Sequence, residues 1–227
     1  MERWYGCVRL SSRHNSSSLP LVLLHLTPHL KGPDALLTSM GSQQAREANK
    51  AWKSQLGYSI PLPQLFLSSP LSRAASTLEL TWLDIVLTTP PFSKPIFLEG
   101  LRETIGLHTC DRRRSKSFLT KTFPNFTFDP TFAEEDELWG PVYQETFRQQ
   151  VVRLKSVLDW IWGVGEEGIS STYVSISAHS GTIAAILENI GHRQFNLQTG
   201  AMIPVVVKGF YGKVWDSSLP MHFYIPI

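Results

Sequence analysis

The stretch YVSISAHSGTIAAIL, residues 173–187, decides the fold class that this sequence predicts. Residues 174–177 are typical of a buried strand, and residues 182–187 begin like a helix. The tight AHSG connection between them places His179 at the carboxyl end of the strand. In α/β folds ligands bind in that crevice, because strand ends and helix amino termini point into it. The sequence therefore predicts that His179 faces a ligand site.

Segments with strand and helix patterns alternate through the rest of the chain. Its 227 residues are 42% apolar, which is enough for one large domain with a substantial core. Two segments, 4–8 and 21–26, compete for the first strand. We predict helices at 38–56 (with Thr38 as its cap and Gly57 as its stop), 72–86 and 146–162, and strands at 64–67, 95–98 and 202–207. This alternation predicts an α/β fold, a three-layer α/β/α sandwich with a mostly parallel sheet, built by residues 1–227 as a single domain.

Composition and short motifs argue against several classes of protein. A net charge of +2 is too small to indicate a nucleic-acid partner, and the apolar run at 19–26 is too short to cross a membrane. The two cysteines do not make a disulfide framework. The sequence contains no metal motif, glycine-rich phosphate loop or dinucleotide fingerprint. We therefore expect a cytoplasmic protein with no cofactor, no metal, no nucleic-acid partner and no membrane contact, and we count a homodimer among its possible assemblies.

A long polar segment follows the strand predicted at 95–98. Residues 99–143 lack periodicity, and we interpret about 104–143 as a lid or insert beside the site. A basic run at 111–116 and an acidic run at 134–137 are either two solvated loops or part of an anion-attracting lid. The aromatic side chains of the segment either pack into the core or lid, which is the default expectation, or line a pocket that selects a partly apolar anion: Phe118, Phe123, Phe126, Phe128, Phe132 and Trp139.

Other side chains with useful chemistry also follow predicted strands. Arg73 would lie in the first turn of a helix, where its planar guanidinium can bind a phosphate or a carboxylate. Glu103 follows the strand at 95–98 and can serve as a general acid or base, while Arg102 can pair with a carboxylate. Ser180, directly after His179, joins the anion-binding candidates.

Together, the motifs that carry these residues resemble a known family. Four stretches are similar to the histidine phosphatase superfamily, also called phosphoglycerate mutase-like, and above all to its fungal branch: SSPLSRAASTLELTW (68–82), LEGLRETIGLHTCDRR (98–113), SAHSGTIAAIL (177–187) and TGAMIPVVVK (199–208). The likeness runs from about Asp34 to Lys208, with the motifs in family order.

The resemblance implies a six-stranded α/β/α core with its site at the carboxyl ends of the strands. It also implies a phosphate cage of two arginines and two histidines. One of these histidines is transiently phosphorylated, and a nearby acid protonates the leaving oxygen. Carried over to this sequence, Arg73 matches the second cage arginine, His179 matches the second histidine, and Glu103 matches the acid.

The sequence departs from the family at the Arg-His-Gly triplet, which should follow the first strand and supply the nucleophile. One alignment sets Arg9 at the arginine, Leu10 at the nucleophile and His14-Asn15 at a later His-Asn pair. A second uses residues 13–15, with asparagine in place of glycine, and a third uses His25 without an arginine before it. Leucine cannot attack phosphorus, so the first alignment closes the covalent route.

Three functions follow from these alternatives. In the first, Arg73, Arg9 and Ser180 bind a small anion, and His179 and Glu103 act as base and acid in isomerase, lyase or cyclase chemistry. In the second, His14 or His25 is the nucleophile of a phosphomonoesterase. In the third, the protein is an inactive binder of anions. In each, the expected ligand is a phosphate ester or a carboxylate.

Overall fold

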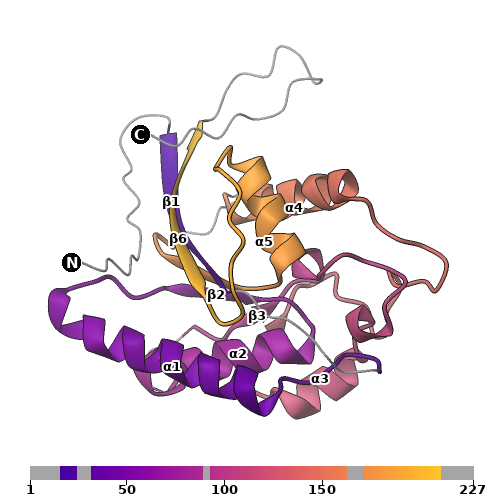
Figure 1. Cartoon of the computed structure of the whole chain (residues 1–227), viewed down its shortest axis with the longest axis horizontal. Coiled ribbons are helices and arrows are strands. Elements are labelled where there is room, and N and C mark those ends of the chain that lie inside the picture. The colour runs from indigo at the N-terminus through magenta and orange to yellow at the C-terminus, as the bar shows by residue number, and fades with distance from the viewer. Residues whose placement is uncertain (1–15, 25–31, 89–92, 163–170, 211–227) are drawn as a thin grey trace.

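The computed structural model describes residues 16–24, 32–88, 93–162 and 171–210. Its described strands form one six-stranded sheet in the order β4-β3-β2-β5-β1-β6 (Figure 1). Every neighbouring pair is parallel except β1 and β6, so the predicted mostly parallel sheet is confirmed. The strands are β1 (Ser16–Leu24), β2 (Leu65–Ser68), β3 (Ile96–Phe97), β4 (Thr127–Phe128), β5 (Val174–Ser177) and β6 (Met202–Phe210).

The register of the sheet aligns the carboxyl ends of its parallel strands. Ser177, the last residue of β5, pairs with Leu24 of β1 on one side and with Ser68 of β2 on the other. Ser68 in turn pairs with Phe97 of β3, which pairs with Phe128 of β4. The segments that follow β2, β3 and β5 therefore leave the sheet at one common edge, where ligands bind in folds of this kind.

The first described strand overlaps one of the two segments predicted for that role. β1 overlaps the segment 21–26 but begins earlier, at Ser16, and ends at Leu24. The competing segment 4–8 lies outside the described residues. Because β1 pairs with both β5 and β6, its carboxyl end lies beside that of β5.

Helices cover both faces of the sheet (Figure 1). One layer contains α1 (Ser39–Gln55), α2 (Ser72–Trp82) and α3 (Lys116–Thr122), and the other contains α4 (Phe147–Ile161) and α5 (Ser180–Asn189). Each layer packs on its own apolar core, and β2 contributes to both cores. Leu65 and Leu67 face α4 and α5, while Phe66 faces α1 and α2. A strand buried on both faces is typical of a parallel sheet between two helical layers, so the predicted three-layer sandwich is confirmed.

Local sequence sets several helix ends. Thr38 caps α1 by accepting a hydrogen bond from the Gly41 amide, as predicted, and Thr146 caps α4 in a capping box with Gln149. The α-helix ends at Gln55 with Leu56 as its C-cap, directly before the predicted stop at Gly57. Gly57 itself lies inside the 3-10 turn Leu56–Tyr58, and Ser59 takes the left-handed conformation that ends this turn. Beyond Trp82 the helix predicted to residue 86 continues as the π-helical turn Leu83–Leu87.

The polar segment 99–143 holds more regular structure than its sequence indicates. It contains the 3-10 turns η3 (Glu99–Leu101) and η4 (Thr109–Asp111), as well as α3 and the edge strand β4. Phe123, Phe126 and Phe132 are buried and pack with Phe97 of β3 in one core. The default expectation that the aromatic side chains pack internally is therefore confirmed for these three. The segment is anchored to the sheet by its own phenylalanines.

Candidate functional site

Arg73 lies in the first turn of α2, just beyond the carboxyl end of β2. Its side chain is only 1% exposed. Nη1 donates to the Cys110 carbonyl oxygen at 2.8 Å, and Nη2 lies 2.7 Å from Oδ1 of Asp111. Within the described part of the chain, Nε has no hydrogen-bond partner. The buried cation therefore has one donor that no described group satisfies, and such a donor favours an anion.

His179 is the N-cap residue of α5, two residues beyond the end of β5, and it is completely buried. Its Nε2 lies 2.8 Å from the hydroxyl oxygen of Ser69. Ser69 belongs to the connection from β2 to Arg73, whose neighbour Ala74 accepts a hydrogen bond from Ser177 of β5 at 2.8 Å. These contacts join the ends of β2 and β5, so the structure brings His179 and the segment that carries Arg73 together.

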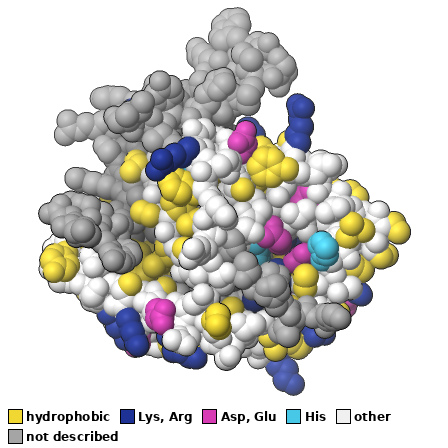
Figure 2. Space-filling view, in the orientation of Figure 1, with side chains coloured by type: hydrophobic (Ala, Val, Ile, Leu, Met, Phe, Trp, Pro, Cys, Tyr) yellow, Lys and Arg dark blue, Asp and Glu magenta, His cyan; other side chains and the backbone are white. Residues whose placement is uncertain are grey.

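The Glu103 side chain lies at the amino terminus of α5, the helix that His179 precedes. Oε2 of its carboxylate accepts hydrogen bonds from the Gly181 amide at 3.3 Å and from the Ser180 hydroxyl at 3.4 Å. Oε1 accepts from the Thr104 amide at 3.0 Å. The carboxylate thus lies at the amino terminus of α5, where the helix dipole favours negative charge, beside the residue that follows His179. On the face shown in Figure 2, exposed acidic and histidine side chains lie next to one another, whereas His179 itself is buried.

Gly181 makes this approach of Glu103 sterically allowed. A Cβ atom at residue 181 would lie 2.3 Å from Oε1 of Glu103 and 3.2 Å from Oγ1 of Thr104. Only a residue without a side chain lets the carboxylate come this close to the helix terminus. The glycine that follows the His179-Ser180 pair is therefore the feature of the sequence that could have indicated a close approach by the Glu103 carboxylate.

Arg102 and Asp111 close the ring of contacts around the strand ends. Nη2 of Arg102 donates to the Asp111 carbonyl oxygen at 2.8 Å, while the carboxylate of Asp111 pairs with Arg73. The Arg102 carbonyl accepts from the Thr182 hydroxyl at 2.7 Å, which ties the Glu103 segment to α5. Contacts therefore run without a break from Arg73 through Asp111 and the Glu103 segment to α5.

The predicted pairing of Arg102 with a carboxylate is confirmed. Its guanidinium binds Asp136 through two hydrogen bonds of 2.6 and 2.7 Å. Burial alone would raise the pKa of Asp136, but the hydrogen bonds and the charge of Arg102 hold that pKa below its ordinary value. Arg102 is therefore a structural anchor of the site.

The basic and acidic runs pack against each other around Arg113. The buried Arg113 guanidinium pairs with Glu99 and donates to the backbone carbonyls of residues 133–135. The interpretation as two solvated loops is therefore wrong at Arg113. Its neighbours Arg112 and Arg114 are exposed, as that interpretation expects, and each lies over an aromatic ring, Trp139 and Phe118 respectively.

Asp34 is a buried carboxyl group that the sequence analysis did not single out as a site residue. It is 2% exposed and accepts hydrogen bonds from the Ser72 amide at 2.7 Å and the Ser72 hydroxyl at 2.5 Å. Burial raises the pKa of Asp34 above its ordinary value, and the bonds from Ser72 and the charge of Arg73 offset only part of this rise. No periodic pattern surrounds Asp34, so only its contact with the start of α2 reveals it.

The remaining predictions concern site residues, metal sites and membrane spans. Arg9, Leu10, His14 and His25 lie outside the described residues. Ser180 is exposed, and its hydroxyl contacts Glu103, as given above. Among the described residues, no cluster of three or more histidine, cysteine, aspartate or glutamate side chains can hold a metal ion. No helix in the described ranges is long and apolar enough to span a membrane.

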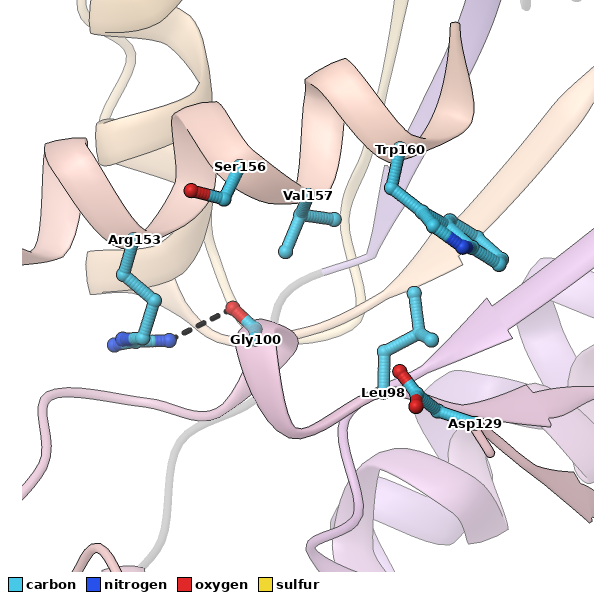
Figure 3. Close-up of a pocket in the computed structure, with 7 residues that line it drawn as sticks. All are labelled: Leu98, Gly100, Asp129, Arg153, Ser156, Val157 and Trp160. Atoms are coloured by element: carbon cyan, nitrogen blue, oxygen red, sulfur yellow. Dashed lines mark hydrogen bonds between the residues drawn. The ribbon is translucent and has the colours of Figure 1, made fainter. Parts of the chain in front are cut away.

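A pocket of about 330 Å³ lies between α4 and the stretch of chain that follows β3 (Figure 3). It is lined by Leu98, Gly100, Asp129 and four residues of α4, including Arg153 and Trp160. None of Arg73, Glu103 and His179 lines it. The candidate site is therefore defined by its contacts at the strand ends, and this pocket is separate from its residues.

Comparisons with known proteins agree with this arrangement. The model of the histidine phosphatase superfamily (branch 1) matches residues 27–201. A probable phosphoglycerate mutase of Arthroderma benhamiae is 42% identical over 175 residues, which cover 77% of this chain and 51% of that protein. Phosphomutase-like protein 3 of Candida albicans is 32% identical over 174 residues, covering 77% and 52%. The chain thus spans about half the length of these curated relatives.

Solved structures show the same fold. Mycobacterial hydrolase 1 superposes with a TM-score of 0.53 at 18% identity, covering 93% of this chain and 97% of that one. The family match includes Arg73, Glu103 and His179 but begins after Arg9, His14 and His25. Because the family model matches most of the chain, and its motifs meet at one edge of the sheet, the chain belongs to the histidine phosphatase superfamily.

Proposed function

We propose that the protein is an enzyme that acts on a small, partly apolar anion at the carboxyl ends of β2, β3 and β5. Arg73 binds the anion, and His179 and Glu103 exchange protons with it. One observation carries this proposal. The Glu103 carboxylate lies at the amino terminus of α5 that His179 begins, and Ser69 links His179 to the segment that bears Arg73.

Charge and exposure support this assignment of roles. A buried guanidinium and a helix amino terminus both favour an anion, and an acid and an imidazole are present on the connected segments for proton transfer. Arg73 and His179 are buried, Glu103 is partly exposed and Ser180 is exposed. A substrate would therefore enter past Ser180 and Glu103, with its anionic group innermost.

Exposed apolar side chains near Glu103 support a partly apolar substrate. The Glu103 segment continues to Leu107, whose amide bonds the Tyr143 carbonyl at 3.0 Å. Leu107 and Tyr143 are 44% and 43% exposed, and the neighbouring Val142 is 93% exposed. Apolar groups that remain exposed beside a polar site are suited to contact the apolar part of a ligand.

Proton transfer by His179 and Glu103 would serve an isomerase, lyase or cyclase reaction, which needs no phosphorylated histidine. Hydrolysis of a phosphate monoester through a phosphohistidine is the second candidate. A specific observation favours it: β1 ends at Leu24 beside Ser177, and the next residue in the sequence is His25. The names of the two fungal relatives, a probable phosphoglycerate mutase and a phosphomutase-like protein, favour phosphate chemistry as well.

The test is to incubate the purified protein with a panel of phosphate monoesters and small carboxylates and to follow products by phosphorus and proton NMR. Glu103→Gln and His179→Ala should each lower turnover about 100-fold or more. Arg73→Met should mainly weaken binding. Lys155→Met, which removes a partly exposed ion pair on α4, is the matched control and should keep full turnover. Full turnover in both Glu103→Gln and His179→Ala would overturn the proposal.

The same panel separates the two reactions. Release of inorganic phosphate that is lost in His25→Ala or His14→Ala, together with acid-labile phosphate on the protein, would establish the phosphomonoesterase. Conversion without phosphate release, and without acid-labile phosphate on the protein, would establish the acid–base reaction. Saturable binding of inorganic phosphate without turnover of any compound would instead identify an inactive binding protein and would overturn the enzymatic proposal.

A further inference from the structure

Arg153 of α4 holds the backbone of the segment that carries Glu103. Its Nη1 donates to the carbonyl oxygens of Gly100 at 2.7 Å and Arg102 at 3.2 Å, and its Nη2 donates to that of Glu103 at 3.3 Å. Figure 3 shows the guanidinium reaching from α4 to Gly100. One side chain thus fixes three carbonyl groups within four residues of the chain.

Glu145 completes this contact from the other side. Its buried carboxylate binds Arg153 through two hydrogen bonds, of 2.8 Å to Nε and 2.6 Å to Nη2. It also accepts from the Ile105 amide at 3.2 Å, while its own amide donates to the Ile105 carbonyl at 2.8 Å. Glu103 therefore lies between a stretch held by Arg153 and a residue held by Glu145.

Regular secondary structure contributes little to fixing the segment at this point. Between β3, which has two residues, and Glu103 the chain forms only the 3-10 turn η3, and its other ties include those of Arg102 to Asp136 and Thr182. The packing of η3 on α4 is tight, because a Cβ atom on Gly100 would lie 2.3 Å from Cγ2 of Val157. Arg153 and Val157 are one helical turn apart, so the same face of α4 contacts the segment at two points.

The same helical face also reaches the Glu103 side chain. Gln150 is buried and lies one turn before Arg153, with its Nε2 3.5 Å from Oε1 of Glu103. The other oxygen of that carboxylate contacts the amide of Gly181 at 3.3 Å. A displacement of the backbone by even half an ångström would move the carboxylate away from α5, because these bonds are already long.

We propose that Arg153 and Glu145 form a positioning pair that sets where the Glu103 carboxylate stands against the amino terminus of α5. This inference rests on the proposed function, in which Glu103 is the acid or base. Neither residue touches the reacting group, so the pair acts only through Glu103. A planar guanidinium suits this role because its donors can bind a carboxylate in a fork and several carbonyls at once.

The direct test is the amide proton of Gly181, observed by NMR in the full chain. Glu103→Ala gives the chemical shift of this amide without its acceptor. In Arg153→Met the shift should move most of the way to that value, and in Arg153→Lys, which keeps the charge but not the fork, it should move part of the way. Lys155→Met on the same helix should leave it unchanged.

A second variant keeps the inference testable if Arg153→Met does not fold. Arg153→Met leaves Glu145 as an unpaired buried charge, whereas the double variant Arg153→Met/Glu145→Gln removes both charges together. The Gly181 shift should move in the double variant as well. A Gly181 amide that stays at its wild-type position in either folded variant would overturn the inference.

The activity assay supplies an independent readout. Arg153→Met should lower kcat about tenfold while KM changes less than about twofold, since Arg73 is untouched. In a Glu103→Gln background, Arg153→Met should cause no further loss of kcat. An equal further loss in that background would show that the pair does not act through Glu103. Full activity of both Glu103→Gln and His179→Ala would instead overturn the proposed function, and the Gly181 measurement would still decide the positioning.

Discussion

Arg73 and Asp111 form a buried ion pair, with Nη2 and Oδ1 2.7 Å apart. The guanidinium that we expect to bind an anion therefore already contacts a carboxylate of the chain. Such a pair keeps the arginine in one orientation, and loss of either partner would leave a buried charge unpaired. The negative charge of Asp111 also repels a second anion at short range. Asp111 thus sets both the stability of the site and its affinity for anions.

Replacing Asp111 by asparagine should separate these two effects. The amide oxygen can still accept a hydrogen bond from Arg73, but the repulsion is removed, so inorganic phosphate should bind about tenfold more tightly. The free energy of unfolding should fall by about 3 kcal/mol, because a buried arginine loses its counter-charge. Titration calorimetry and urea unfolding measure the two quantities, with Asp159→Asn as the control. Weaker phosphate binding in Asp111→Asn would show that the carboxylate serves the anion site rather than opposing it.

The hydrogen bond between Ser69 and His179 should matter for turnover more than for folding. Ser69→Ala removes a buried bond to the imidazole, which fixes the ring orientation and the proton position. We expect a loss of about 1 kcal/mol in the free energy of unfolding and a loss of about tenfold in kcat. Ser68→Ala is a matched control because its buried hydroxyl bonds a backbone carbonyl instead. Equal kcat values for the two variants would contradict the role of this bond.

Gly181→Ala should lower turnover without stabilising the protein, unlike an ordinary glycine-to-alanine substitution in a helix. Alanine normally stabilises a helix relative to glycine by up to about 1 kcal/mol. Here its Cβ would collide with Oε1 of Glu103 at 2.3 Å and push the carboxylate away from α5. We expect kcat to fall about 10-fold to 100-fold with little change in Tm. Thermal unfolding and steady-state kinetics test this together, and unchanged kcat would mean that the acid is not placed by the contact with residue 181.

The raised pKa of Asp34 predicts how stability depends on pH. Burial is the main cause of the rise above the ordinary value of 3.8. As the pH rises from that value through the raised pKa, the folded state retains a proton that the unfolded state has lost, so stability falls across this window and is level above it. The free energy of unfolding of wild type minus that of Asp34→Asn should therefore decrease with rising pH.

Urea unfolding of both proteins at a series of pH values, from about pH 4 to about pH 8, measures this difference. A difference that stays constant, or that grows with pH, would contradict the buried, proton-retaining state of Asp34.

The residues with the clearest chemistry could be found from the sequence because each follows a strand. Arg73, Glu103 and His179 belong to motifs in which an apolar strand gives way to a short turn, and the parallel register then brings these turns to one edge. The helix cap Thr38 was similarly local, since a cap bonds an amide only three residues away. Such features depend on a few consecutive residues, so pattern and propensity are sufficient to predict them.

Tertiary structure alone decided the contacts that surround and support these residues. Asp111 meets Arg73 across 38 positions of sequence, Ser72 meets Asp34 across 38, and Arg153 meets the Glu103 carbonyl across 50. Periodicity carries no information about such pairs, because a lone carboxylate or arginine in a polar segment has the same local pattern whether it is solvated or buried. Only packing determines which charges are removed from water, and a charge removed from water must find a partner wherever the fold provides one.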